Sequence, residues 1–446
     1  MSEFAIPGGG ATSVDYDAVI RAAERDPQRL EQLYQAARAA RATGRFNDAL
    51  SNRYREAPDN LLYAAWYYRL NAPAAATPAR AANWNLAIPL SIVLGLVLWA
   101  LSDNSLTLAH NIPLLVVLWA PLVAIFLIAF LALTSRQHLV AAAVAVVLLA
   151  AFTAYAALMV ARGQGTSSET YSMLLVLHLP LLAGCAVGFG LLGWGSSALD
   201  RFGFLTKAIE VIATAGVASI AGGIFVGLTY GLFGALNIEI DDALLRLLVI
   251  GGGGLIPVLA VAATYDPTIS AGQQDFLHGF GRLIRILLWA LLPLTLAVLL
   301  VYIAFVPFNF MQPFNNRNVL IIYNALLFAV IALLVGVTPV HAEDVPERLQ
   351  RWLRWGIVAV AALVALVSIY ALAAILYRTA SDGLTMNRLT VIGWNTINIL
   401  ILAALLVSQF VRGNNWISRL QSVFRWGTVA YLVWGALLVL ALPWLF

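Results

Sequence analysis

The amino-acid sequence predicts an all-α, polytopic membrane protein with a small helical domain at its N-terminus, and three observations support this fold class. Of the 446 residues, 61% are hydrophobic and only 11% are charged, whereas about 25% are charged in a soluble globular protein. Mean hydropathy is +0.86. Charge is concentrated near the N-terminus, with nine acidic residues and nine arginines among the first 79. No water-soluble fold buries so much apolar surface, so we expect a lipid bilayer around most of the chain.

The charged N-terminal part is predicted to be a separate module that faces water. Its start has neither the basic residues nor the apolar run of a secretory signal peptide, and we expect it to be disordered. Apolar residues then recur at helical spacing, with breaks that predict helices over 46–55 and 61–70. The predicted parts are a disordered N-terminus (1–15), a helical head on the cytoplasmic side (16–70), a linker (71–85) and a transmembrane domain (86–446).

Five residues of the head follow a recognisable pattern: Gly44, Phe46, Ala49, Pro58 and Asn60. They resemble the second half of a tetratricopeptide repeat, in which the glycine permits a tight turn and the proline closes the helix pair. The interval from Ala49 to Pro58 is shorter than that family's usual spacing, and only one copy is present. The resemblance implies a surface for a protein partner. The alternative is a plain helical hairpin that packs on the membrane domain.

Eleven segments after residue 85 meet the requirement for a membrane-spanning helix, which is a run of about 20 apolar residues. The first segment is short and the fifth is the longest. The predicted spans are 86–102, 112–134, 138–161, 171–194, 204–234, 243–264, 283–306, 318–340, 353–377, 387–411 and 426–445.

The basic residues of the short loops predict the orientation of the chain, because Lys and Arg are retained on the cytoplasmic side of a membrane. With the N-terminus inside, twelve of them flank the spans on the inner side and five on the outer side. We therefore expect a multi-pass protein of a bacterial cell (inner) membrane, with a cytoplasmic N-terminus and an extracytoplasmic C-terminus.

Ionisable side chains inside a bilayer are costly and therefore mark candidate functional positions. Glu210 is the only acidic residue within a predicted span, and it lies one helical turn from Lys207. It is either an ion or proton ligand or one half of an interfacial ion pair. His178 lies in the middle of the fourth span, two residues before Pro180. It either lines a polar cavity or makes an interhelical hydrogen bond.

Glycine is concentrated in the middle of the membrane domain. In the fifth span a small residue recurs every four positions, which predicts a smooth face for close helix packing. In the sixth span four consecutive glycines precede Pro257, and a helix tolerates such a run poorly. Broken helices inside a membrane line cavities or are buried in protein, so this run predicts either a substrate pathway or close packing. The packing face consists of Ser219, Gly223, Gly227 and Gly231, and the glycine run of Gly251, Gly252, Gly253 and Gly254.

The loop before the tenth span carries a compact motif, Asp382-Gly383-Leu384-Thr385-x-x-Arg388. Asp382 and Gly383 favour a turn, and Thr385 favours the start of a helix. The motif resembles the Tyr-Gly-Leu-Thr-x-x-Arg stretch of a bacterial multi-spanning family, domain of unknown function 4153, with Asp382 in place of the tyrosine. The resemblance, together with a similar helix count, applies to the last two-thirds of the chain. It implies a fold family without an established activity.

Several function classes are excluded or left without support by the sequence. A net charge of only +4, spread thinly, excludes a nucleic-acid binder, and a single cysteine, Cys185, excludes a disulfide-built secreted domain. No Gly-x-Ser-x-Gly motif, carboxylate pair within the spans or metal-ligand cluster occurs, so we expect no enzyme activity, no metal and no cofactor. Two functions remain. One is a transporter or conduit for a small, neutral or weakly polar solute, and the other is a non-transporting scaffold or assembly subunit of a membrane complex.

Overall fold

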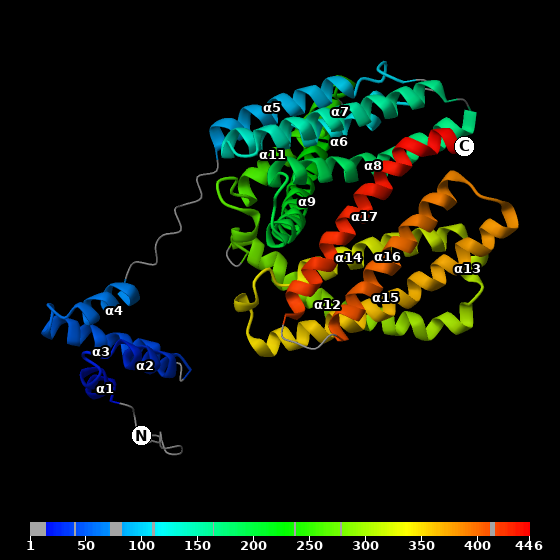
Figure 1. The fold of residues 1–446 in the computed structure, drawn as a ribbon. Helices are drawn as coiled ribbons and strands as arrows, with labels where there is room; N and C mark the ends of the chain where they lie inside the picture. The colour runs from blue at the N-terminus through cyan, green and yellow to red at the C-terminus, as the bar shows by residue number, and fades with distance from the viewer. Residues whose placement is uncertain are drawn as a thin grey trace. The chain divides into compact units, whose positions relative to one another are not determined.

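The computed structural model describes residues 15–39, 42–71, 83–108, 112–163, 165–235, 238–276, 279–410 and 415–446. It confirms the all-α fold class, because these residues form helices and no strand (Figure 1). The chain divides into two compact units, Met1–Ala81 and Ala82–Phe446. The N-terminal segment that we predict to be disordered lies outside the described residues except for Asp15, and so does most of the predicted linker.

Unit 1 contains four helices, one more than the breaks in the sequence suggest. Asn60 caps the last of them, as expected, because its Oδ1 accepts hydrogen bonds from the backbone N–H groups of Leu62 and Tyr63 at 2.9 and 3.2 Å. Gly44, which we expected in a turn, lies instead in the first turn of the third helix, because that helix already begins at Thr43. The four helices are α1 (Tyr16–Ala22), α2 (Pro27–Ala39), α3 (Thr43–Glu56) and α4 (Leu61–Asn71).

The helices of unit 1 share a hydrophobic core of their own. Phe46 is fully buried in this core, and the ring of Trp66 packs against it with centroids 6.1 Å apart. Arg53 is also buried, and its guanidinium pairs with the carboxylates of Asp17 and Glu56. A buried charge is tolerated only when it is paired in this way. Unit 1 therefore has both a packed core and a compensated buried charge.

Unit 2 contains eleven helices that are long and apolar enough to cross a membrane, counted over the described residues, and this is the number predicted. The protein is therefore a multi-pass membrane protein by the length and composition of its helices. The spanning helices are α5 (Trp84–Leu101), α6 (Leu114–Ser135), α7 (Leu139–Arg162), α8 (Gly165–Leu192), α9 (Ala198–Ala235), α10 (Asp242–Arg246) continued by a π-helical turn η2 (Leu247–Gly251) and α11 (Gly252–Thr264), α12 (Gly279–Phe305), α14 (Arg317–Val337), α15 (Glu347–Asp382), α16 (Met386–Phe410) and α17 (Trp416–Leu445); a short helix α13 (Gln312–Asn315) lies between α12 and α14.

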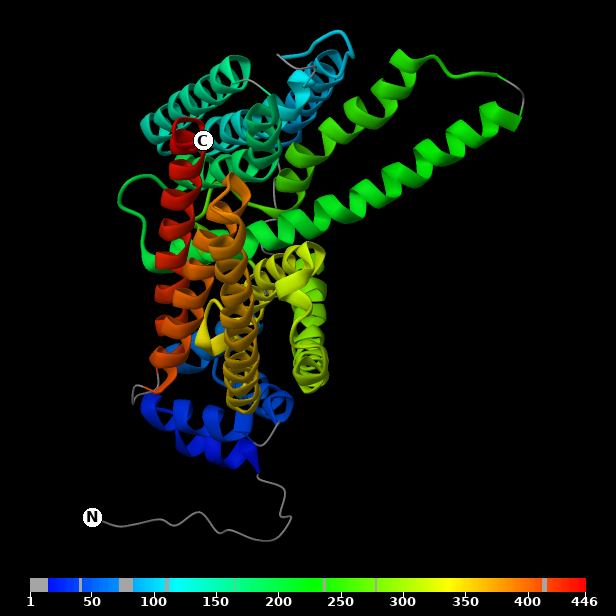
Figure 2. The same cartoon turned by 90° about the vertical axis from the view of Figure 1, so that its right-hand side faces the viewer.

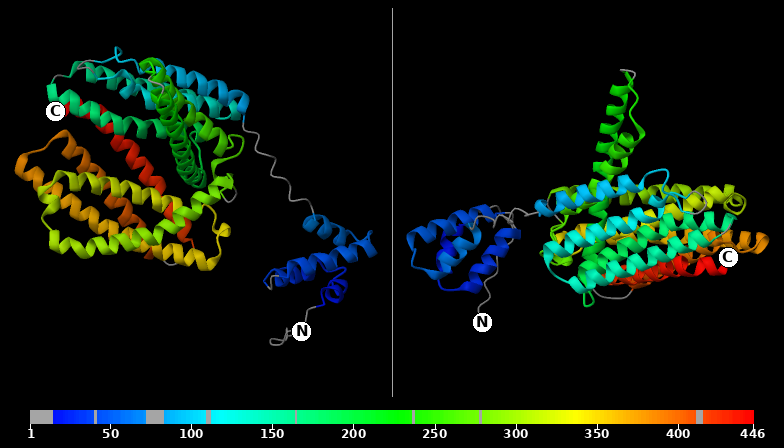
Figure 3. Two further views of the ribbon diagram at one scale, coloured as in Figure 1. Left: turned by 180° about the vertical axis from the view of Figure 1, so that it is seen from behind. Right: turned by 90° about the horizontal axis from the view of Figure 1, so that it is seen from above.

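Two helical bundles make up unit 2, and the views in Figures 1 and 3 show them from opposite sides. The first bundle contains α5, α6, α7, α8 and α11, and the second contains α12, α14, α15 and α16. The first part of α9 and the whole of α17 join them. Phe202 of α9 stacks on Phe424 of α17 with ring centroids 6.1 Å apart, and α17 also packs on α8. By contrast, α8 and α14 make no extensive contact with each other.

The predicted packing face of the fifth span has no neighbour among the described residues of the chain. A Cβ atom built on Gly223, Gly227 or Gly231 would meet nothing within 4 Å, and Ser219 is exposed. The reason is that α9, with 38 residues, extends away from both bundles beyond Ala215, as Figure 2 shows in green. The expectation of close packing within the chain is therefore wrong for this face.

The sixth span remains helical through its four glycines, although we expected a break. The π-helical turn η2 ends at Gly251, and α11 begins directly at Gly252. A Cβ on Gly254 would lie 2.7 Å from Cα of Gly95 in α5, and a Cβ on Gly95 would lie 2.5 Å from the carbonyl oxygen of Gly251. A Cβ on Gly252 or Gly253 would meet nothing within 4 Å. Close packing on α5 therefore explains two of the four glycines.

Candidate functional site

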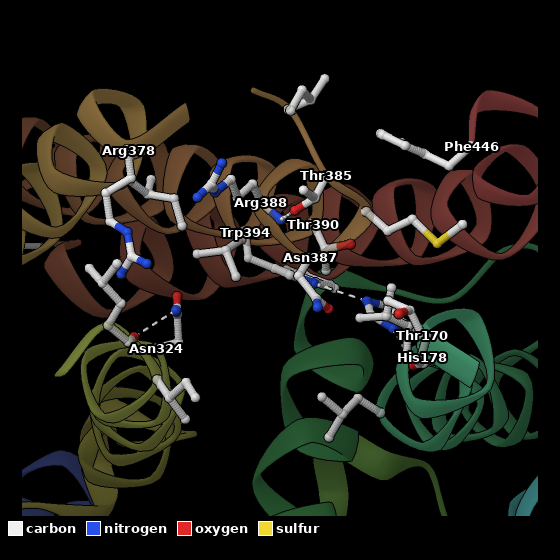
Figure 4. A pocket seen from close by; sticks show the side chains of 18 of the residues that line it. Thr170, His178, Asn324, Arg378, Thr385, Asn387, Arg388, Thr390, Trp394 and Phe446 are labelled. Carbon is white, nitrogen blue, oxygen red and sulfur yellow. Dashed lines mark hydrogen bonds between the residues drawn. The ribbon is translucent and has the colours of Figure 1, made fainter. Parts of the chain in front are cut away.

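A cavity of about 1120 Å³ lies between the two bundles, bounded by α8, α14, α15 and α16, with the end of α17 at its rim (Figure 4). Its volume exceeds the range of about 300–1,000 Å³ that is usual for ligand pockets. The structure brings together two features that the sequence singled out separately, the mid-span histidine and the loop motif before the tenth span. The polar lining residues are Ser167, Thr170, His178, Asn324, Arg378, Thr385, Asn387, Arg388 and Thr390.

His178 lies on the cavity wall and is held by two hydrogen bonds. Its Nδ1 lies 2.6 Å from the carbonyl oxygen of Leu174, and its Nε2 accepts a hydrogen bond of 3.1 Å from the indole Nε1–H of Trp394 in α16. An indole N–H only donates, so Nε2 carries no proton and Nδ1 is the donor to Leu174. His178 is therefore a neutral imidazole, only 3% exposed, that ties α8 to α16. This is the interhelical hydrogen bond that we weighed against a cavity-lining role, and the structure shows both.

The carbonyl group that Pro180 leaves without its helical hydrogen bond is not the one that His178 contacts. A proline removes the hydrogen bond to the carbonyl four residues earlier, which here belongs to Val176. The imidazole bonds to Leu174 instead. The proline and the histidine therefore act on different carbonyl groups of α8.

A group of buried amide and hydroxyl side chains continues inward from the cavity along α16. Asn395 Nδ2 donates a hydrogen bond of 3.0 Å to Oδ1 of Asn324, which lines the cavity. One turn deeper, Asn398 Oδ1 accepts a hydrogen bond from the hydroxyl of Tyr431 in α17. Asn395 and Asn398 are almost fully buried. Thr390 is also buried, and it lies on the cavity wall at the outer end of this group.

Several of these buried polar atoms have no hydrogen-bond partner among the described residues. They are Oγ1 of Thr390, Oδ1 of Asn395 and Nδ2 of Asn398. The great majority of buried polar groups in proteins are hydrogen-bonded, so each exception requires an explanation. All three lie on α16, and one of them, Thr390, lines the cavity.

The loop motif forms the outer rim of the cavity. Gly383 ends α15 with a φ of +85°, a conformation that side chains with a Cβ rarely adopt. The Arg388 guanidinium then folds back over the turn, where it donates to the carbonyl of Gly383 and pairs with Asp382 at 2.6 Å. Thr385 Oγ1 accepts a hydrogen bond from the backbone N–H of Arg388 at 3.3 Å, and Leu384 lines the rim with an exposed side chain. The turn and the helix start that we predicted are both present.

Glu210 does not belong to the cavity. Its carboxylate accepts a hydrogen bond from Lys207 Nζ at 2.7 Å, and the same ammonium group donates to the carbonyl of Asp275 at 2.6 Å. A Cβ on Gly281 of α12 would lie only 2.9 Å from Glu210 Oε2, so α12 passes close to the pair. The structure therefore shows a buried ion pair within α9, next to α12, and an ion pair is one of the two roles that we considered. The glycine run of the sixth span also lies away from the cavity lining.

The sequence interpretation missed the amide residues and the arginine of this site. It looked for charges, histidines and glycines within the spans, whereas Asn395 and Asn398 are uncharged. The signal was present in the segment Trp394-Asn395-Thr396-Ile397-Asn398, where two amides and an indole lie within two helical turns of a span. Arg378 was assigned to a loop, but α15 continues to Asp382 and carries its side chain into the cavity lining.

Comparison with known proteins adds no relative, since models of known families, curated proteins and solved structures each returned no match. The resemblances to the domain-of-unknown-function family and to the tetratricopeptide repeat therefore stay predictions. Among the described residues, no group of three or more His, Cys, Asp or Glu side chains is placed to hold a metal ion.

Proposed function

We propose that the protein is a transporter or conduit for a small, neutral or weakly polar solute, and that this solute binds in the cavity between α8 and α14. The single observation that carries the proposal is the set of unpartnered polar atoms on Thr390, Asn395 and Asn398. Within a membrane such atoms are costly unless a ligand or water satisfies them. Their position beside a large cavity supports a polar path that a solute uses.

The order of these side chains along α16 favours a path over a single binding point. A rise of about 1.5 Å per residue places Asn398 about 12 Å further along the helix than Thr390. Asn324 of α14 and Tyr431 of α17 join the same group of side chains from two other helices. Hydroxyl, amide and neutral imidazole groups offer hydrogen bonds without charge, which suits a neutral or weakly polar solute.

The proposed orientation places the mouth of the cavity on the extracytoplasmic side of a bacterial cell membrane. With a cytoplasmic N-terminus, eleven spans put the end of α17 outside. Phe446 and Leu384 both line the cavity, so its rim lies at this end of the bundle. The polar path along α16 then leads from the rim toward the cytoplasm.

A second candidate function, a non-transporting scaffold or assembly subunit, is favoured by α9. The face formed by Ser219, Gly223, Gly227 and Gly231 meets no described side chain, and it is smooth enough for another membrane helix to approach closely. The head then provides a further surface for a protein partner. In a scaffold, the buried amides beyond the cavity, Asn395 and Asn398, have no exchange with water on either side of the membrane.

Thiol accessibility separates the two functions, because Cys185 is the only native cysteine. In a Cys185→Ser background, the test variants are Thr390→Cys at the cavity wall and Asn398→Cys deeper in the path. The matched control is Leu400→Cys, since Leu400 is exposed on the same helix at a position that faces lipid. A membrane-impermeant maleimide is added to right-side-out and to inside-out vesicles, and modification is measured by mass.

For a transporter or conduit we expect both test thiols to be modified, Thr390→Cys from the outside and Asn398→Cys from the inside. The control thiol at position 400 should remain unmodified, because a thiol in lipid does not ionise and the reagent does not reach it. If both test thiols are as unreactive as the control from either side, the transporter proposal is wrong and the scaffold is preferred.

A further inference from the structure

We propose that the solute of this cavity is an amphiphile with an anionic end, a carboxylate or a phosphate on an acyl chain, and that it reaches the cavity sideways from the bilayer. The inference rests on the proposed function. It keeps the transport or conduit role of the cavity and replaces the neutral or weakly polar solute of the proposed function with a molecule that has one charged head. The geometry points to Arg378 as the group that binds this head.

The cavity wall changes from polar to apolar along α8. Ser167 and Thr170 line it near the outer end of the helix, and Leu174, Leu177 and Leu181 line it further in. At about 1.5 Å per residue, this wall is about 21 Å long from Ser167 to Leu181. One leaflet of the hydrocarbon core is about 15 Å thick, half of about 30 Å. The mainly apolar part, from Leu174 to Leu181 and interrupted by His178, is about 10 Å long, so it contacts part of an acyl chain, while Ser167 and Thr170 lie where the headgroup would be.

The opposite wall shows the same gradient. On α15 and α16 the outer end carries Arg378, Thr385 and Arg388, which Figure 4 labels. Further along their helices lie Trp394 of α16 and Phe328 of α14, with Asn324 as a polar residue between. On both walls, charged or hydroxyl residues lie at the outer end and mainly apolar residues lie further in. A soluble, wholly polar solute would leave the leucine and aromatic side chains of the inner half without apolar contact. The distribution of polar and apolar residues along the cavity therefore favours an amphiphile.

Arg378 is the cation of the cavity that is available to a ligand. Its Nη1 is buried and has no hydrogen-bond partner among the described residues. Arg388, the other charged residue of the described lining, is already engaged by Asp382 and by the carbonyl of Gly383. No carboxylate side chain lines the cavity in the described part of the chain. A guanidinium in these surroundings binds carboxylate or phosphate oxygens through charge-assisted hydrogen bonds.

One side of the cavity is lined by exposed apolar side chains, where the acyl chains of the bilayer would lie. Leu177 of α8 and Ile321 of α14 both line it, yet their side chains are 71% and 56% exposed. The two helices that carry them make no extensive contact. An apolar chain therefore has a route between α8 and α14 that never crosses water, whereas a free aqueous anion has none on this side.

Equilibrium binding to the full-length protein in phosphatidylcholine nanodiscs tests the proposal. The ligands are radiolabelled oleate and lysophosphatidate, which are anionic amphiphiles, monoolein, which has a neutral head, and inorganic phosphate, which has no chain. The variants are Arg378→Met, which removes the charge, and Arg378→Lys, which keeps it. The matched control is Arg351→Met, since Arg351 is an exposed arginine of the same helix outside the cavity lining.

We expect saturable binding of oleate and lysophosphatidate, at least about tenfold weaker binding to Arg378→Met, and no change for Arg351→Met, because only Arg378→Met removes a charge-assisted hydrogen bond to the anionic head. Arg378→Lys should retain most of the affinity. A third variant, Ala325→Trp, fills the cavity while keeping Arg378 and should reduce binding of both amphiphiles. It keeps the test decisive if Arg378→Met does not fold.

Two results would overturn the inference. One is monoolein binding as tightly as oleate with no effect of Arg378→Met, which would show a neutral site. The other is phosphate binding as tightly as lysophosphatidate, which would show a site for an aqueous anion. The failure of the proposed function has a different signature, namely saturable amphiphile binding at Arg378 together with unreactive thiols at positions 390 and 398. That result supports a bound lipid in a protein that does not transport.

Discussion

Gly254→Ala is expected to destabilise the protein although alanine is the better helix former. The added Cβ would lie 2.7 Å from Cα of Gly95, about 0.7 Å inside the 3.4 Å at which ordinary contact begins. Because the obstacle is backbone, no side-chain rotation relieves it, and overpacking of this kind costs about 1–3 kcal/mol. The gain in helix propensity offsets about 1 kcal/mol of that cost. Gly253→Ala is the matched control, since it has the same gain in helix propensity and its added Cβ would meet no atom within 4 Å.

The two variants should therefore differ in stability by about 1–3 kcal/mol. The control Gly253→Ala should be more stable than the wild type, and Gly254→Ala should be less stable than the control. Thermal unfolding in detergent, followed with a thiol-reactive dye that reports on Cys185, measures the difference. We expect the two Tm values to differ by at least about 2 °C. Equal Tm values for both variants would refute the close crossing of α5 and α11. Since α11 is already helical at Gly252 and Gly253, alanine at either position should also leave transport intact.

Trp394→Phe removes the N–H that His178 accepts and should cost about 0.5–1.5 kcal/mol in thermal unfolding, whereas the exposed Trp426→Phe should cost nothing; equal effects would contradict the bridge between α8 and α16. The fragment 15–71 should be soluble and helical by circular dichroism, and Phe46→Ala should unfold it, because loss of a buried ring costs about 3–5 kcal/mol. Aggregation of the unsubstituted fragment would speak against an independent head. A reporter after Phe446 should behave as extracytoplasmic and one near Glu343 as cytoplasmic; a cytoplasmic signal from both would mean an even number of spans.

The number of spans was predictable because it depends on one local quantity, the length of an apolar run relative to the thickness of a bilayer. The cap at Asn60 and the turn at Gly383 were predictable for a similar reason, since each depends on the residue and its immediate neighbours. The structural role of an individual glycine was not predictable. Gly253 and Gly254 are adjacent in sequence, but only one of them faces α5, and that difference arises from the packing of the whole unit.

The candidate site was predictable in its parts and not as a whole. His178 and the Arg388 motif stand more than 200 residues apart, and no local pattern indicates that one cavity joins them. Asn395 and Asn398 were missed because burying an uncharged amide in a membrane costs less free energy than burying a carboxylate. Amides therefore do not stand out when candidate residues are chosen by that cost. Glu210 was singled out for its charge, and it forms a buried ion pair with Lys207 within α9.

The length of α9 exceeds what is needed to cross a membrane. Its 38 residues extend about 57 Å, nearly twice the hydrocarbon core of about 30 Å. Such a helix cannot stand upright with all of its apolar residues in lipid, and it relieves this hydrophobic mismatch by tilting. Its first part is anchored in the bundles, and its outer part is exposed along Ile220, Ile224 and Leu228. We therefore expect the angle between α9 and the bundles to change with bilayer thickness.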